Sequence, residues 1–120
     1  MTDVLVKLCD DNGFLKDWQA WTPDLAEQIA KVEGIDGIFI GPSDLSGSIG
    51  KIGQFEDQEV QDLIYEGLEL STKAGKPAGI LTGKKDYAKK YVEAGYTFVA
   101  INSDTNLFAR SAENLLKEFK

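Results

Sequence analysis

Short apolar runs alternate with longer amphipathic stretches along most of this chain of 120 residues. Four runs are apolar almost throughout and are bounded by turn-forming residues, which predicts buried β-strands. They are Val4–Leu8, Gly37–Ile40, Ala78–Leu81 and Phe98–Ile101. The first run is followed by the polar turn Cys9–Gly13, and the apolar spacing within Phe14–Trp21 predicts one or two helical turns.

The amphipathic stretches have helical spacing and end signals. Thr22-Pro23 predicts the start of a helix that Gly34 ends, and Gly75 with Pro77 ends the next one. The glycine-rich stretch from Gly41 to Phe55 predicts a long functional loop. The predicted helices cover residues 23–32, 57–74, 85–94 and 105–119, the last with Phe108, Ala112, Leu115 and Phe119 on one face.

Strands that alternate with amphipathic helices predict an α/β fold with a parallel sheet, right-handed crossovers and helices packed against the sheet. The length fits a single domain, residues 1–120, built from four βα units.

Composition narrows the possible functions. The formal net charge of −7 argues against nucleic acid and against anionic membranes as partners. One cysteine, no apolar run near the roughly 20 residues of a membrane helix and no leader-like start predict a cytoplasmic protein. The chain has no histidine, the commonest general base, and its one arginine, Arg110, is expected to pair with a neighbouring acid.

Polar residues follow the predicted strands at Asp44, Thr82, Asn102, Ser103 and Asp104. The carboxyl ends of parallel strands share one edge of a sheet, so these residues are expected to lie near one another. Carboxylate oxygens suit Mg²⁺ or Mn²⁺, and the amides around Ser43 could hold an anion. The alternative is that Asp44 and Asp104 only cap the helices that follow them.

Residues 32–46, with the sequence VEGIDGIFIGPSDLS, resemble the signature of the HpcH/HpaI aldolases. The resemblance covers residues 24–120 and includes Ala74–Leu81, Gly95–Ala100 and the segment from Ser103 to Arg110. It implies part of a TIM-type (β/α)8 barrel and metal-dependent lyase chemistry on pyruvate and other 2-oxo acids. Residues 1–23 do not resemble the family and could be a replaced, designed or evolved segment.

The resemblance also implies a site. Asp44 matches a ligand of the divalent metal, Mg²⁺ or Mn²⁺. The backbone amides of Ser43 and Asp44 match the groups that hold the carboxylate of pyruvate, within the loop that Gly41 and Pro42 open. Leu81 matches an apolar residue beside the aldehyde. The metal would stabilise a pyruvate enolate during aldol cleavage or addition.

Three parts of the family's site have no counterpart here, so the resemblance assigns no catalytic residue. They are a histidine, an arginine and a second metal-ligating glutamate, at whose place Cys9, Asp10 or Trp18 would stand. One hypothesis is therefore a half-barrel aldolase derivative with little or no activity alone. The alternative is a non-catalytic scaffold. A half-barrel exposes sheet edges and an apolar inner face, which predicts a homodimer or a cover formed by the N-terminal tryptophans.

Overall fold

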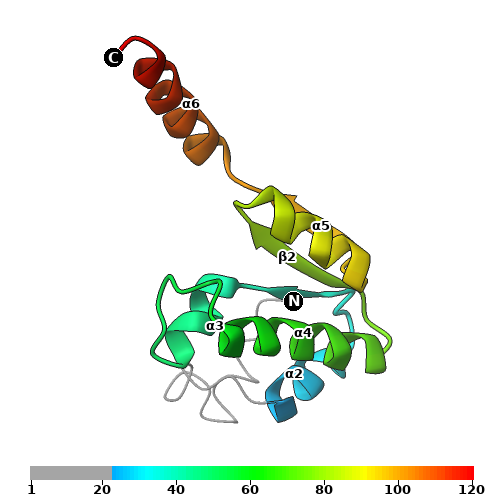
Figure 1. Ribbon diagram of the computed structural model, residues 1–120. Helices are drawn as coiled ribbons and strands as arrows, with labels where there is room; N and C mark the ends of the chain where they lie inside the picture. Colours follow the sequence, from blue (N-terminus) through cyan, green and yellow to red (C-terminus); the bar gives the residue numbers. More distant parts are fainter. Residues whose placement is uncertain (1–22) are drawn as a thin grey trace.

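The computed structural model describes residues 23–120 (Figure 1). The predicted strand Val4–Leu8 and the predicted helical turns over Phe14–Trp21 lie outside the described residues. Helices and strands alternate along the rest of the chain, which confirms the α/β class. The elements are α2 (Pro23–Ala30), β1 (Ile38–Ile40), α3 (Pro42–Ser48), α4 (Gln58–Lys73), β2 (Ala78–Thr82), α5 (Lys85–Ala94), β3 (Phe98–Ile101) and α6 (Asp104–Glu118).

The three described strands form one sheet in the order β1-β2-β3, and both pairings are parallel. Gly79 of β2 is in register with Phe39 of β1 on one side and with Phe98 of β3 on the other. Because side chains alternate between the two faces of a strand, these three residues share one face of the sheet. All three strands therefore end at the same edge, after Ile40, Thr82 and Ile101.

Helix α4 shows how closely the pattern predicts the structure. Its N-cap is Asp57, whose carboxylate accepts a hydrogen bond from the Glu59 N–H at 3.0 Å. A carboxylate at this position satisfies a backbone donor that has no partner within the helix. The apolar stripe of α4 is buried, with Val60 and Ile64 fully inaccessible. The predicted bounds of α5 and β3 are likewise confirmed.

The prediction of a continuous loop from Gly41 to Phe55 is wrong, because its first half forms α3. Pro42 occupies the first turn, where its missing N–H costs nothing, and Leu45 is buried. The Ser46 hydroxyl donates to the Ser43 carbonyl at 2.9 Å. Glycine and serine favour turns over helices, so the composition of this segment predicts a loop. The buried leucine and the proline nevertheless stabilise a short helix.

The core lies between one face of the sheet and the helices. Ile40, Ala78 and Ile80 point to this face and pack with Val60 and Ile64 of α4. Each large buried side chain contributes about 1.5–3 kcal/mol relative to an exposed position. In Figure 1, α3 and α4 lie along one side of the sheet and α5 lies beside β2. The sheet is therefore stabilised from its helical side.

Two tyrosines extend this core with their hydroxyl groups satisfied. The Tyr96 hydroxyl donates to the Ile64 carbonyl at 2.6 Å, and the Tyr91 hydroxyl donates to Gln61 Oε1 at 3.2 Å. Burial raises the pKa of both phenols above the usual value. Both rings therefore stay neutral and pack edge to face, with centroids 5.6 Å apart.

The opposite face of the sheet is open. Phe39, Leu81 and Phe98 lie on it and are 52%, 43% and 64% exposed, and the two phenylalanine rings meet with centroids 5.9 Å apart. No helix of the described range covers this face, which is the arrangement expected for the inner wall of a partial barrel. The open face thus leaves apolar surface in contact with water.

Helix α6 differs from the other long helices. The prediction that every helix packs against the sheet is wrong for α6, because none of its residues is buried, including the apolar residues predicted to share one face. Figure 1 shows this helix projecting away from the sheet. Its amphipathic pattern therefore has no partner within residues 23–120. None of the described helices combines the length and the apolar composition needed to cross a membrane.

We predict that Gly79→Ala destabilises the fold by about 1–3 kcal/mol. A Cβ at Gly79 would lie 2.8 Å from Phe39 Cδ2 and 3.1 Å from the Phe98 carbonyl oxygen, and the carbonyl cannot rotate away. Gly83→Ala is the matched control, because its nearest contact would be an ordinary 3.8 Å and its stability should change by less than about 1 kcal/mol. Urea unfolding measures both. Equal midpoints for the two variants would contradict the prediction.

Candidate functional site

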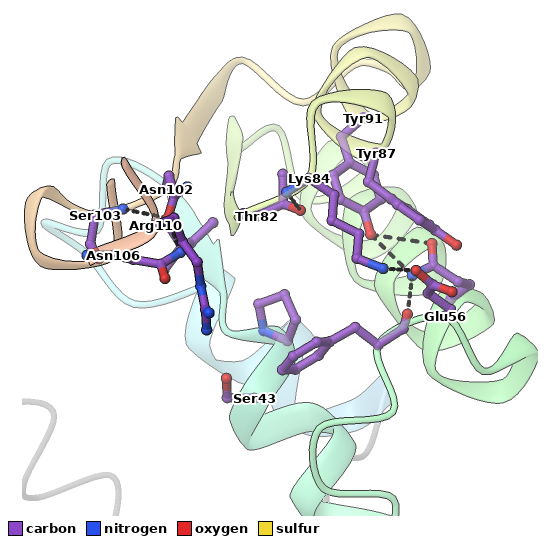
Figure 2. Close-up of a pocket in the computed structure, with 15 residues that line it drawn as sticks. Ser43, Glu56, Thr82, Lys84, Tyr87, Tyr91, Asn102, Ser103, Asn106 and Arg110 are labelled. Atoms are coloured by element: carbon purple, nitrogen blue, oxygen red, sulfur yellow. Dashed lines mark hydrogen bonds and ion pairs between the residues drawn. The ribbon is translucent and has the colours of Figure 1, made fainter. Parts of the chain in front are cut away.

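A cavity of about 590 Å³ opens at the edge where the three strands end (Figure 2). Its wall is built from the segments that follow β1, β2 and β3, together with the loop before α4, the start of α4 and the first two turns of α5 and α6. Of the polar residues predicted to lie near one another, Thr82, Asn102 and Ser103 line this cavity, whereas Asp44 and Asp104 do not. The lining residues are Pro42, Ser43, Phe55, Glu56, Gln61, Leu81, Thr82, Gly83, Lys84, Tyr87, Tyr91, Asn102, Ser103, Asn106 and Arg110.

The predicted substrate-binding residues divide into two groups. Pro42, Ser43 and Leu81 line the cavity, whereas Gly41 and Asp44 do not. Asp44 is exposed in the first turn of α3. A Cβ at Gly41 would lie 3.0 Å from Asp44 Oδ2, so the glycine leaves room for the carboxylate to fold back over the helix start.

The alternative in which aspartates only cap helices is not supported at either position. The N-cap of α3 is Gly41, and the N-cap of α6 is Ser103, whose hydroxyl accepts from the Asn106 N–H at 3.3 Å. Asp104 Oδ1 instead accepts from the Thr105 N–H at 2.7 Å. Asp44 is therefore not required as a cap.

The start of α3 offers backbone donors near the cavity. Gly41 provides no side-chain cap, and Pro42 has no N–H. Within residues 23–120, the Ser43 and Asp44 N–H groups donate to no protein acceptor, whereas Leu45 N–H bonds the Gly41 carbonyl at 2.9 Å. Such N–H groups at the start of a helix attract anions. This arrangement fits the predicted role of these two amides.

Two salt bridges of Lys51 hold the loop between α3 and α4 against the start of α4. Lys51 Nζ lies 2.6 Å from Asp57 Oδ1 and 2.7 Å from Glu59 Oε2. The hydrogen bond to Asp57, and then that to Glu59, raises the pKa of Lys51. The hydrogen bond from Lys51 lowers the pKa of Asp57. These two ion pairs of Lys51 join the loop to the first turn of α4.

Gln61 holds the far end of this loop against the cavity. Its Nε2 donates to the Phe55 carbonyl at 2.5 Å and to the Tyr91 hydroxyl at 3.1 Å. Gln61 is 8% exposed, so these bonds are largely shielded from water. These bonds fix the backbone of Phe55, which is one of the residues that line the cavity.

Several lining residues were not predicted as site residues. Tyr87 and Tyr91 were predicted as inward positions of a helix, and they reach the cavity because α5 lies beside its mouth. Lys84 forms an ion pair with Glu56 across the same side (Figure 2). Arg110 pairs with Glu113 at 2.5 Å, as predicted, and also lines the cavity. The four-residue spacing of Asn106 and Arg110 on α6 was the available signal.

The described residues do not form a complete site for a divalent cation. Across residues 23–120, no three side chains among His, Cys, Asp and Glu are grouped to hold a metal ion. Asp44 supplies one carboxylate, whereas Mg²⁺ and related cations take about six oxygen ligands, several of them water. One carboxylate alone does not define such a site.

Comparison with known proteins identifies the family to which this chain is similar. The profile of the HpcH/HpaI aldolase/citrate lyase family matches residues 24–111. A 4-hydroxy-2-oxo-heptane-1,7-dioate aldolase of Shigella sonnei is 47% identical over 92 residues, which cover 77% of this chain and 35% of that protein. A hydroxypyruvate/pyruvate aldolase of Deinococcus radiodurans is 46% identical over 94 residues, covering 78% and 34%.

Solved structures of this family resemble the fold of this chain. A family protein from Burkholderia cenocepacia superposes with a TM-score of 0.74 at 32% identity, covering 81% of this chain and 38% of that one. The parallel sheet with helices on its outer side is thus part of a TIM-barrel architecture. The chain belongs to the HpcH/HpaI aldolase/citrate lyase family, and it spans about a third of the length of the relatives it matches.

We predict that Lys51→Met loosens the loop beside the cavity without unfolding the chain. The loop amides of Gln54 and Asp57 donate to the Lys51 and Gln54 carbonyls, so their hydrogen exchange should accelerate by about three- to tenfold. Lys73→Met is the control, because Lys73 pairs with Glu69 on the exposed side of α4, away from the loop. Unchanged exchange in Lys51→Met would show that the ion pairs do not hold the loop.

Proposed function

We propose that this chain carries the part of an aldolase site that binds pyruvate or another small 2-oxo acid. The observation that carries the proposal is the pair of N–H groups at Ser43 and Asp44, which lack protein acceptors in the described range, beside a cavity that Ser43 and Leu81 line. A carboxylate is the natural ligand for such amides. The rest of the cavity gives room for the remaining atoms.

In this proposal each predicted residue has one task. Gly41 and Pro42 shape the start of α3, the Ser43 and Asp44 amides hold the carboxylate, and Leu81 lies beside the aldehyde portion. Asp44 would contribute one oxygen ligand to Mg²⁺ or Mn²⁺, whose chemistry when bound is stabilisation of the enolate. The remaining ligands would have to come from outside the described residues. We also propose a cytoplasmic location, as expected from the composition of the sequence.

Aldol cleavage by this chain alone is expected to be slow or absent. A general base has to lie within hydrogen-bond reach of the proton that it removes, and the family's usual histidine has no counterpart in this sequence. The second candidate function is therefore a non-catalytic scaffold that keeps the fold. Binding without turnover supports the first proposal, and the absence of both favours the scaffold.

The first test measures pyruvate binding by calorimetry in Mg²⁺ buffer and pyruvate release from a 4-hydroxy-2-oxo acid. We expect binding that Asp44→Asn weakens about tenfold, because the cation loses a ligand. Asp86→Asn removes the same charge from the first turn of α5, outside the cavity lining, and should have no effect. Absence of pyruvate binding would contradict the proposal. Turnover that disappears in Asp44→Asn would contradict the scaffold.

We also propose that the chain forms a homodimer. The proposal is supported by the open face of the sheet, with Phe39 and Phe98 more than half exposed, and by the apolar residues of α6. Surface of this kind commonly marks a contact with another protein. A second copy could cover it and close a barrel of eight strands if residues 1–22 add a strand to each copy.

Light scattering tests the dimer. We expect a mass twice that of the 13.2 kDa chain, and a shift toward the monomer in Phe98→Gln. Val92→Gln is the control, because Val92 is 58% exposed on α5 and not on the open face. A single species of 13.2 kDa in the unmodified chain would rule out the dimer.

A further inference from the structure

One side of the cavity is lined by aromatic side chains that have no task in the proposed function. They are Phe55, in the loop before α4, and Tyr87 and Tyr91, which are one turn apart on α5. Figure 2 shows both tyrosines on the side of the cavity that carries Glu56 and Lys84. We call Phe55, Tyr87 and Tyr91 the aromatic wall.

Hydrogen bonds hold the aromatic wall in place. Gln61, which is 8% exposed, donates from Nε2 to the Phe55 carbonyl at 2.5 Å and to the Tyr91 hydroxyl at 3.1 Å. The Tyr91 hydroxyl donates in return to Gln61 Oε1 at 3.2 Å. The Tyr87 and Tyr91 rings pack with their centroids 6.0 Å apart. The wall is therefore formed before a ligand arrives, which lowers the entropy cost of binding.

The aromatic wall presents apolar surface and no net charge. Phe55 is 40% exposed and Tyr87 is half-buried, so both leave apolar surface open to the cavity that they line. The Tyr91 hydroxyl is already engaged by Gln61. Lys84 pairs with Glu56 beside the wall, so these two charges compensate each other. A neutral, apolar ligand group is therefore a better complement of the wall than an ion.

The rings also determine the shape of the group that fits. Aromatic rings prefer other rings in offset or edge-to-face contact, with centroids about 4.5–7 Å apart, and this preference adds to the effect of buried area. Neighbouring rings of the protein already use this geometry, since Tyr65 meets Tyr91 edge to face with centroids 6.1 Å apart. A saturated ring of the same size gains the buried area without the ring contact. A flat aromatic ring is thus the best complement.

We propose that the aromatic wall binds the ring of an aromatic aldehyde, with Tyr87 as the residue that selects a flat ring over a saturated one. The assignment of the ring to the aldehyde rests on the proposed function, in which the 2-oxo acid lies at the start of α3. Ser43 and the wall line the same cavity of about 590 Å³, a volume typical of sites for small organic ligands. The cavity thus has room for both reactants.

The first test compares benzyl alcohol with cyclohexylmethanol, which has the same carbon skeleton and a saturated ring. Neither alcohol forms an imine with lysine, and both are titrated without pyruvate or Mg²⁺. Amide NMR shifts at Phe55 and Tyr87 should report benzyl alcohol binding about three- to tenfold more tightly than cyclohexylmethanol. Equal affinities would overturn the proposal. Shifts centred on Phe39 and Phe98 would also overturn it, because they would place the ligand on the open face of the sheet.

Substitutions then test the wall itself. Tyr87→Leu should abolish the preference for benzyl alcohol, and Phe55→Leu should reduce it while keeping the carbonyl that Gln61 binds. Tyr65→Leu is the matched control, because Tyr65 is 38% exposed on α4 and does not line the cavity. An equal loss in Tyr65→Leu would overturn the role of Tyr87. Circular dichroism confirms that each variant keeps the fold.

A last titration repeats the benzyl alcohol measurement at saturating pyruvate and Mg²⁺. Unchanged affinity for benzyl alcohol supports a ring that belongs to the aldehyde, since both ligands then occupy the cavity together. Competition between them would overturn this assignment. Absence of pyruvate binding would contradict the proposed function and the assignment to an aldehyde, whereas the ring site would still be established by the titration without pyruvate.

Discussion

The parallel pairing of three strands through Gly79 is the constraint on which the rest of the structure depends. Phe39 and Phe98 flank this glycine in register, and a Cβ there would clash with the Phe39 ring and crowd the Phe98 ring and carbonyl. Parallel pairing in this register ends all three strands at one edge. Ser43, Thr82 and Asn102 meet at the cavity because of that common edge, although they are far apart in the sequence.

The regular elements could be predicted from the sequence because their signals are local. Asp57 at the start of α4 and Gly95 after α5, with φ of 118°, act within one turn of chain. Helix α3 could not be predicted from local signals, because its stability comes from burying Leu45 against residues that are distant in the sequence. The site residues that could be predicted from the sequence are those that directly follow a strand. Gln61 links Phe55 to Tyr91 by hydrogen bonds at the cavity, and no sequence pattern predicts such a tertiary contact.

The surroundings of Asp44 show that a chain can keep the local geometry of a site without the groups that complete it. The glycine that makes room for its carboxylate and the two amides beside it are present, so the local geometry is intact. The carboxylate nevertheless has too few neighbours among residues 23–120 to hold a cation. A barrel site collects its residues from the ends of several strands, and three strands can supply only some of them. Family membership therefore establishes the architecture, whereas an activity has to be argued from the site itself.

The incomplete site and the open sheet face have the same physical origin. Phe39 and Phe98 are exposed because no strand or helix of residues 23–120 completes the wall around them, and in the same range Asp44 belongs to no cluster of acidic side chains that could hold a metal ion. Additional βα units, from residues 1–22 or from a second copy, would bury apolar surface and bring further side chains to the same edge. Closing the barrel and completing the site are thus one requirement, because the strands that cover the open face also end beside the cavity.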